Sequence, residues 1–322
     1  MELLAALFIL ACAAMLVFME LRHRLGSRTP ASPQSSASCV NNLKQLGMAL
    51  KLYAAEDPAG MWPRVQGDQP YGSTSPAHCV NADKRGDFMF QISAMMPEYA
   101  TDPVLLACPT DPEIEDVNED LGIVTDDGTG ECKYVGVVTN ADQSYMYTGY
   151  VFDKVEDDFG TVDPKAFGIP ATDDIGFQAS IFLMSLVIGG FGDGDPSNDG
   201  FLDVPLDLSQ VPVPGDWGTG VGSNGKMLRL RNGIVDSLDT AGRYPGAKPA
   251  KDEASLPVIW DIIYGKPASV PRKADDNGNP ILTNHEPGGS NVLYMDGHVD
   301  FSEYPKRFPA NRGTVALFSA FG

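Results

Sequence analysis

The first 21 residues form an apolar stretch that is long enough to cross a membrane as a helix. The sequence MELLAALFILACAAMLVFMEL carries only two charged residues, Glu2 and Glu20, one near each end. About 20 consecutive apolar residues span the hydrocarbon core of a bilayer. We therefore expect one continuous helix over residues 1–25. A cleaved secretory signal is the alternative, although such signals begin with a basic region and have a shorter apolar run.

The residues that follow this stretch bear on its orientation. Arg22, Arg24 and Arg28 come directly after it, and the positive-inside rule would keep that side in the cytoplasm. The cysteines of the chain instead indicate export. A basic leader that is cleaved before residue 1 would resolve this conflict. A lipoprotein signal is a further alternative, because Ile-Leu-Ala-Cys at residues 9–12 loosely resembles one.

Four of the five cysteines predict a disulfide framework. Cys12 lies in the apolar stretch, and the others are Cys39, Cys79, Cys108 and Cys132. Four cysteines in an exported chain imply two disulfides with three possible pairings. Proximity along the chain favours Cys39–Cys79 and Cys108–Cys132. No C-x-x-C pair is present, so the spacing does not predict a zinc site.

The charge of the chain limits its function. Its formal net charge is −20, with 43 acidic and 23 basic residues. A nucleic-acid interface needs clustered lysine and arginine, so this composition argues against one. Acidic oxygens instead favour divalent cations.

A loop of alternating acidic residues is the candidate calcium site. Its candidate ligands are Asp193, Asp195, Ser197, Asp199 and Asp203. Gly200 stands where a calcium-binding loop turns sharply, but the usual glutamate at the twelfth position is replaced by Leu206. A solvated acidic loop without a cation is the alternative.

Periodicity predicts several elements of the exported region, residues 38–322. After a break at residues 26–37, apolar residues at helical spacing predict an amphipathic helix over 39–56, with Ser38 as its N-cap. The run at 177–190 predicts a buried helix, 226–237 a short amphipathic helix, and 256–260 a buried strand. Asp296-Gly297 between two apolar runs predicts a hairpin within residues 285–301.

Two segments carry a family resemblance. Residues 38–47, SCVNNLKQLG, and residues 285–299, HEPGGSNVLYMDGHV, resemble the prepilin-type cleavage/methylation proteins with an H-X9-DG C-terminal domain, which are common in planctomycetes and verrucomicrobia. The chain departs from the family pattern in two respects. Ten residues instead of nine separate His285 from Asp296, and the chain starts at Met1-Glu2 without the family's basic leader.

The resemblance implies an α+β, pilin-like fold in which a long N-terminal helix packs on an antiparallel β-sheet with long loops. It implies a membrane-anchored, exported subunit of an extracellular pilus-like filament or pseudopilus. The expected partners are copies of the same chain, the inner membrane before assembly, and pilus or type II secretion machinery. The alternatives are a surface-binding protein that does not polymerise and a minor pseudopilin. The residues expected to make the assembly contacts are Glu2, Leu3, Leu7, Leu10 and Ala14.

The C-terminal motif is interpreted as architectural. Its residues are His285, Gly288, Gly289, Asn291, Asp296 and Gly297. The glycines allow close backbone approach, Asp-Gly makes the turn, and His285 is expected to hydrogen-bond the hairpin. A metal or acid–base role for His285 and His298 beside Asp296 is the alternative. No nucleophile elbow, phosphate loop or H-E-x-x-H motif is present, so we expect neither an enzyme nor a cofactor other than calcium.

Overall fold

The computed structural model describes residues 33–67, 86–111, 114–123, 138, 140–153, 155, 161–163, 165, 174–191, 197, 199–207, 226–238, 252–263, 273–274, 280–281, 283–285 and 288–319. Its helices are α2 (Pro33–Glu56), α3 (Ile92–Met95), α4 (Val117–Asp120), α5 (Phe177–Gly189) and α6 (Arg312–Ser319). Short 3₁₀ helices include η1 (Pro103–Leu106) and η4 (Asp199–Asp203).

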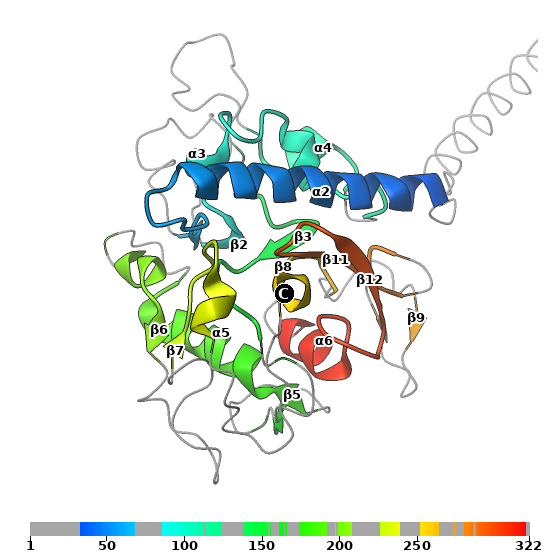
Figure 1. Cartoon of the computed structure of the whole chain (residues 1–322). Helices are drawn as coiled ribbons and strands as arrows, with labels where there is room; N and C mark the ends of the chain where they lie inside the picture. Colours follow the sequence, from blue (N-terminus) through cyan, green and yellow to red (C-terminus); the bar gives the residue numbers. More distant parts are fainter. Residues whose placement is uncertain are drawn as a thin grey trace, which may run out of the picture.

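An antiparallel four-stranded sheet lies at the centre of the described part of the chain (Figure 1). Its strand order is β12 (Val299–Glu303), β11 (Gly289–Tyr294), β8 (Pro257–Asp261) and β3 (Tyr145–Tyr147). The remaining strands form two-stranded sheets: β1 (Val65–Gln66) with β2 (Asp87–Phe90), β4 (Thr161–Val162) with β5 (Ile175–Gly176), β6 (Leu206–Asp207) with β7 (Lys226–Met227), and β9 (Lys273–Ala274) with β10 (Pro280–Ile281).

The central sheet separates two hydrophobic cores. Neighbouring side chains of a strand point to opposite faces. Ile259 and Leu293 therefore belong to the core that includes α2, whereas Trp260 and Val292 belong to the core that includes α5 and α6. Figure 1 shows α2 on one side of the sheet and α5 and α6 on the other. Because all four of these strand residues are buried, both faces of β8 and β11 are covered.

Helix α2 packs on the sheet through a stripe of apolar side chains. Leu43, Leu46 and Leu50 recur at intervals of three and four residues, and each is fully buried. This spacing places them on one face of a helix. Gly47 lies on the same face, where a Cβ atom would come within 3.0 Å of the Leu293 side chain. A larger residue at this position would require the Leu293 side chain to move by a few tenths of an ångström.

Three of the elements predicted from the sequence are present in the structure. The helix at 177–190, the buried strand at 256–260 and the C-terminal hairpin are confirmed. The amphipathic helix begins at Pro33 instead of residue 39, so Ser38 lies within it and does not cap it. The prediction of a helix over 226–237 is wrong. These residues start with β7 and end with a 3₁₀ helix at Ile234–Ser237, because their backbone pairs with β6 and with residues 60–62 and 149–151.

The prediction of a pilin-like fold with a long apolar N-terminal helix is also wrong for the described residues. Their architecture is α+β with helices of 4 to 24 residues and antiparallel sheets. The longest helix is α2, and no helix among the described residues is both long and apolar enough to cross a membrane. Residues 1–25, on which that prediction rested, lie outside the described residues.

Candidate functional site

A disulfide bond joins helix α2 to the segment that follows η1. Cys39 lies on the buried face of α2, and its sulfur bonds to that of Cys108 across 69 residues of sequence, with 5.1 Å between the two Cα atoms. Both cysteines are fully buried. Beside them, the Asn42 side chain donates a hydrogen bond of 3.0 Å to the carbonyl of Ala107.

This bond overturns the pairing that proximity favoured. The sequence interpretation paired Cys39 with Cys79 and Cys108 with Cys132, but the structure pairs Cys39 with Cys108. The reason is that η1 packs against α2, which brings Cys108 next to the helix although closer cysteines exist in the sequence. Cys79 and Cys132 lie outside the described residues.

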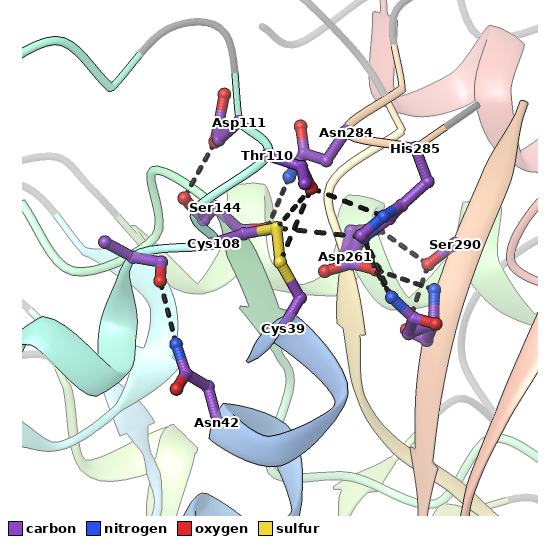
Figure 2. The surroundings of a disulfide bond; sticks show 12 residues. Cys39, Asn42, Cys108, Thr110, Asp111, Ser144, Asp261, Asn284, His285 and Ser290 are labelled. Atoms are coloured by element: carbon purple, nitrogen blue, oxygen red, sulfur yellow. Dashed lines mark hydrogen bonds and ion pairs between the residues drawn. A yellow bond between two sulfur atoms is a disulfide. The ribbon is translucent and has the colours of Figure 1, made fainter. Parts of the chain in front are cut away.

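A histidine from the segment before β11 packs against this disulfide (Figure 2). His285 Nε2 lies 3.7 Å from Cys108 Sγ, and His285 Nδ1 lies 3.3 Å from Thr110 Oγ1. The same Thr110 oxygen lies 3.4 Å from Cys39 Sγ and 3.0 Å from Cys108 Sγ. His285 is 2% exposed. The cluster therefore joins three chain segments away from solvent.

A buried carboxylate holds the other side of the histidine ring. Asp261 Oδ2 lies 2.6 Å from His285 Nε2. The same oxygen accepts hydrogen bonds from the Asn291 backbone N–H at 2.7 Å and from Asn291 Nδ2 at 2.8 Å. Since Asp261 is completely buried, these donors are needed to stabilise its charge. His285 Nε2 thus faces Asp261 Oδ2 at 2.6 Å and Asn291 Nδ2 at 2.8 Å, whereas Nδ1 faces the Thr110 hydroxyl.

Other polar groups link this cluster to the sheet. Ser290 Oγ donates to the Asp261 carbonyl at 2.9 Å. On β3, burial raises the pKa of Tyr145 well above its ordinary value, and the negative charge of Asp261 adds to that shift. Ser144 Oγ, next to Tyr145, donates to Asp111 Oδ2 at 2.7 Å. The cluster thus ties strands β3, β8 and β11 to the disulfide.

The predicted architectural motif lies partly in this cluster and partly at the hairpin turn. His285 and Asn291 are in the cluster, Gly288 and Gly289 lead into β11, and Asp296 and Gly297 form the turn. The structure does not bring the two histidines together. His285 is buried before β11, whereas His298 stacks on Tyr294 with 4.4 Å between ring centroids at the exposed turn.

The carboxylate at the turn is bound by its neighbour. The Asp296 side chain accepts from the His298 backbone N–H at 3.0 Å, and its Oδ1 lies 2.6 Å from His298 Nδ1. Partial burial alone would raise the pKa of Asp296, but the hydrogen bonds from His298 hold it below its ordinary value. The turn is therefore stabilised by its own side chains as well as by glycine.

The candidate calcium residues that the structure describes lie beside arginines. Asp203 Oδ2 is 3.2 Å from Arg64 Nη1, and Asp203 Oδ1 is 3.8 Å from Arg229 Nη1. Asp199 is buried, and its Oδ2 is 4.0 Å from Arg64 Nη2. Ser197 is exposed in a turn. Asp193 and Asp195 lie outside the described residues, as do the expected assembly residues Glu2, Leu3, Leu7, Leu10 and Ala14.

Sequence reasoning missed two members of the buried cluster. Asp261 carried a weak signal, because it is a charged residue directly after the apolar run Val258-Ile259-Trp260. Such a residue is expected to need a buried partner. Nothing in the sequence indicated a role for Thr110, since a threonine near a cysteine is common.

Comparisons with family models, with curated proteins and with solved structures find no match to this chain.

Proposed function

We propose that this chain is an exported structural subunit of a surface filament or pseudopilus. In this proposal the apolar stretch at residues 1–21 holds the chain in the membrane and then packs against the same stretch of neighbouring subunits. The globular part faces outward. The observation that supports the proposal best is the Cys39–Cys108 disulfide near the start of α2.

The position of this disulfide suits a subunit that is pulled at its N-terminal end. Helix α2 begins at Pro33, shortly after the apolar stretch, and Cys39 is its seventh residue. A force on residues 1–32 reaches α2 first. Because Cys39 is covalently bound to the globular part, α2 cannot peel from the sheet at this end without breaking a covalent bond. Leu43, Leu46 and Leu50 then distribute the force over the core.

The disulfide and the charge of the chain also support this proposal. A stable disulfide forms in an oxidising environment such as the periplasm or the cell exterior. The net charge of −20 gives the assembly an acidic surface, which favours solubility. Small residues in the apolar stretch, including Ala5, Ala6 and Ala14, permit close packing between helices.

The test is to shear surface material from the native organism, image it by cryo-electron microscopy and identify the protein by mass spectrometry. Helical filaments that contain this chain, with residues 1–25 packed along the axis, are the expected result. If the chain stays in the membrane fraction and no filament contains it, the proposal is wrong, and a membrane-anchored binding protein takes its place. Sparse labelling confined to filament tips would instead identify a minor subunit.

Two matched variants sharpen this test. A buried carboxylate within packed helices must be paired, so Glu2→Gln is expected to reduce the yield of sheared filaments. Glu20→Gln removes a charge at the other end of the same stretch and is expected to leave the yield unchanged. Both variants should reach the membrane in equal amounts. Equal filament yields from the two variants would contradict the assembly role of Glu2.

A further inference from the structure

Four potential ligand atoms converge where the disulfide, His285 and Thr110 meet. The two cysteine sulfurs and one ring nitrogen of His285 all lie within 4.8 Å of one another. They come from α2, from the segment after η1 and from the segment before β11, and Figure 2 shows them gathered around Thr110. All three residues are at most 2% exposed. A cation bound here would be shielded from water.

The Thr110 hydroxyl lies close to all three candidate ligand atoms. Its Oγ1 lies 3.4 Å from Cys39 Sγ, 3.0 Å from Cys108 Sγ and 3.3 Å from His285 Nδ1. Ligand atoms of a tetrahedral zinc site lie about 3.3 to 3.8 Å apart, because Zn–S bonds are about 2.3 Å and Zn–N or Zn–O bonds about 2.0 to 2.1 Å long. The distances to Cys39 and His285 fall in this range, and that to Cys108 is slightly shorter. The two sulfurs are bonded to each other in the structure, so they would have to separate on reduction before a cation could enter between them.

The surroundings of the histidine also match a zinc site. A histidine that binds zinc through one nitrogen usually donates the N–H of its other nitrogen to a carboxylate or a carbonyl. Here Asp261 Oδ2 lies 2.6 Å from Nε2, and the other nitrogen, Nδ1, lies 3.3 Å from the Thr110 hydroxyl. Asn291 fixes Asp261 in turn, with donors at 2.7 and 2.8 Å. Asn291 thus holds Asp261 in place, and Asp261 in turn orients the His285 ring.

We propose that Cys39, Cys108 and His285 bind Zn²⁺ when the disulfide is reduced, with Thr110 or a water molecule as the fourth ligand. Two thiolates and an imidazole suit Zn²⁺, whereas Ca²⁺ and Mg²⁺ require oxygen ligands. The protein then has two exclusive states, a disulfide-bonded state and a zinc-bound state. In both states α2 stays joined to the segment after η1.

A phosphine can serve as the reductant that converts the disulfide-bonded state into the zinc-bound state. The phosphine gives two electrons to the S–S bond and becomes a phosphine oxide with oxygen from water. The S–S bond breaks, and each sulfur takes a proton to become a thiol. Zn²⁺ then replaces the two thiol protons, which pass to the solvent. Removing the metal with a chelator and adding an oxidant returns the disulfide.

The experiment uses the full chain in detergent, reduced with a phosphine and then freed of it without oxygen. Co²⁺ is added first, because its visible absorption reports tetrahedral coordination and its near-ultraviolet band reports bonds to sulfur. We expect both signals to saturate at one equivalent of Co²⁺, and Zn²⁺ to displace the Co²⁺. The oxidised chain should give neither signal. Signals of equal strength from the oxidised chain, or none from the reduced chain, would overturn the proposal.

Because the chain has other cysteines that could bind the metal, variants are needed to show which residues are the ligands. Cys39→Ser and His285→Gln should lose the tetrahedral signal, whereas Cys79→Ser should keep it. Asp261→Asn should weaken Zn²⁺ binding about 10- to 100-fold, as is typical when a carboxylate behind a histidine ligand is removed. Asp300→Asn, an exposed control, should bind as the parent chain does. Loss of the signal in Cys79→Ser together with its survival in Cys39→Ser would assign the metal elsewhere and refute the proposal.

A second measurement does not depend on variants that fold poorly. A ligand that binds only the folded state raises its stability. Added Zn²⁺ should therefore raise the melting temperature of the reduced parent chain and leave that of the oxidised parent chain unchanged. An equal rise in both forms, or no rise in either, would count against the site.

Discussion

Gly289 shows how one residue sets the geometry of the hairpin. It starts β11 opposite Glu303, with a φ of +156°. A Cβ atom at this position would lie 2.3 Å from the carbonyl oxygen of Ser302, far inside van der Waals contact. That oxygen belongs to the backbone of β12, which is itself paired with β11. A larger residue would therefore have to push the two strands apart.

We predict that Gly289→Ala lowers the free energy of unfolding by about 2 to 4 kcal/mol, since backbone strain at such a position alone costs about 1 to 3 kcal/mol. Equilibrium urea unfolding of the full chain measures the change. The matched control is Gly200→Ala, because no heavy atom lies within 4 Å of a Cβ atom built there. The control should stay within about 0.5 kcal/mol of the parent chain. Equal losses in both variants would contradict this account of Gly289.

At the scale of elements, α2 is held on the sheet by one face only. Leu46 is fully buried, whereas Met48, two residues further along, is 61% exposed. Leu52, four residues after Met48, is also exposed. Two residues along a helix turn the side chain by about 200°, so these neighbours occupy opposite faces. The stability that α2 contributes should therefore depend on the inner face.

We predict that Leu46→Ala lowers the free energy of unfolding by about 2 to 5 kcal/mol, since it removes buried contacts and leaves a cavity. Met48→Ala should change it by less than about 0.5 kcal/mol. Urea unfolding followed by circular dichroism measures both variants. A loss at Met48 as large as that at Leu46 would show that the outer face of α2 is covered in the assembled protein.

At the scale of the whole molecule, the two cores share one sheet. Ile259 and Leu293 face one core, and their neighbours Trp260 and Val292 face the other. Neither core can be dismantled without exposing one side of β8 and β11. The described part of the chain should therefore unfold as one cooperative unit.

Hydrogen exchange tests this cooperativity. Leu46→Ala changes the core that includes α2, but we expect it to lower the exchange free energy of amides in α5 by the same amount as the global stability. The reason is that α5 amides in a single cooperative unit exchange only when both cores open. Mass spectrometry of exchanged peptides over residues 177–189 gives the measurement. If α5 keeps its protection while global stability falls, the two cores unfold separately.

The sequence by itself determined the features that depend on neighbours in the chain. The spacing of Leu43, Leu46 and Leu50 specified a helix and its buried face, because a helix repeats every 3.6 residues. Asp296-Gly297 specified the hairpin turn, since the turn geometry needs residues that tolerate positive φ, and Gly297 has a φ of +98°. These patterns are local, so composition and order suffice to predict them.

Only the tertiary structure decided the buried cluster and the arrangement of the elements around it. Cys39 bonds to Cys108 across 69 residues, and Thr110 meets His285 across 175. Which distant residues meet depends on how α2, η1 and β11 pack, and no local periodicity encodes that choice. The entropy of closing a loop changes only slowly with its length, so nearness in sequence is a weak guide to pairing. That is why proximity predicted the wrong partner for Cys39, and why Asp261 was found only when the fold placed it behind His285.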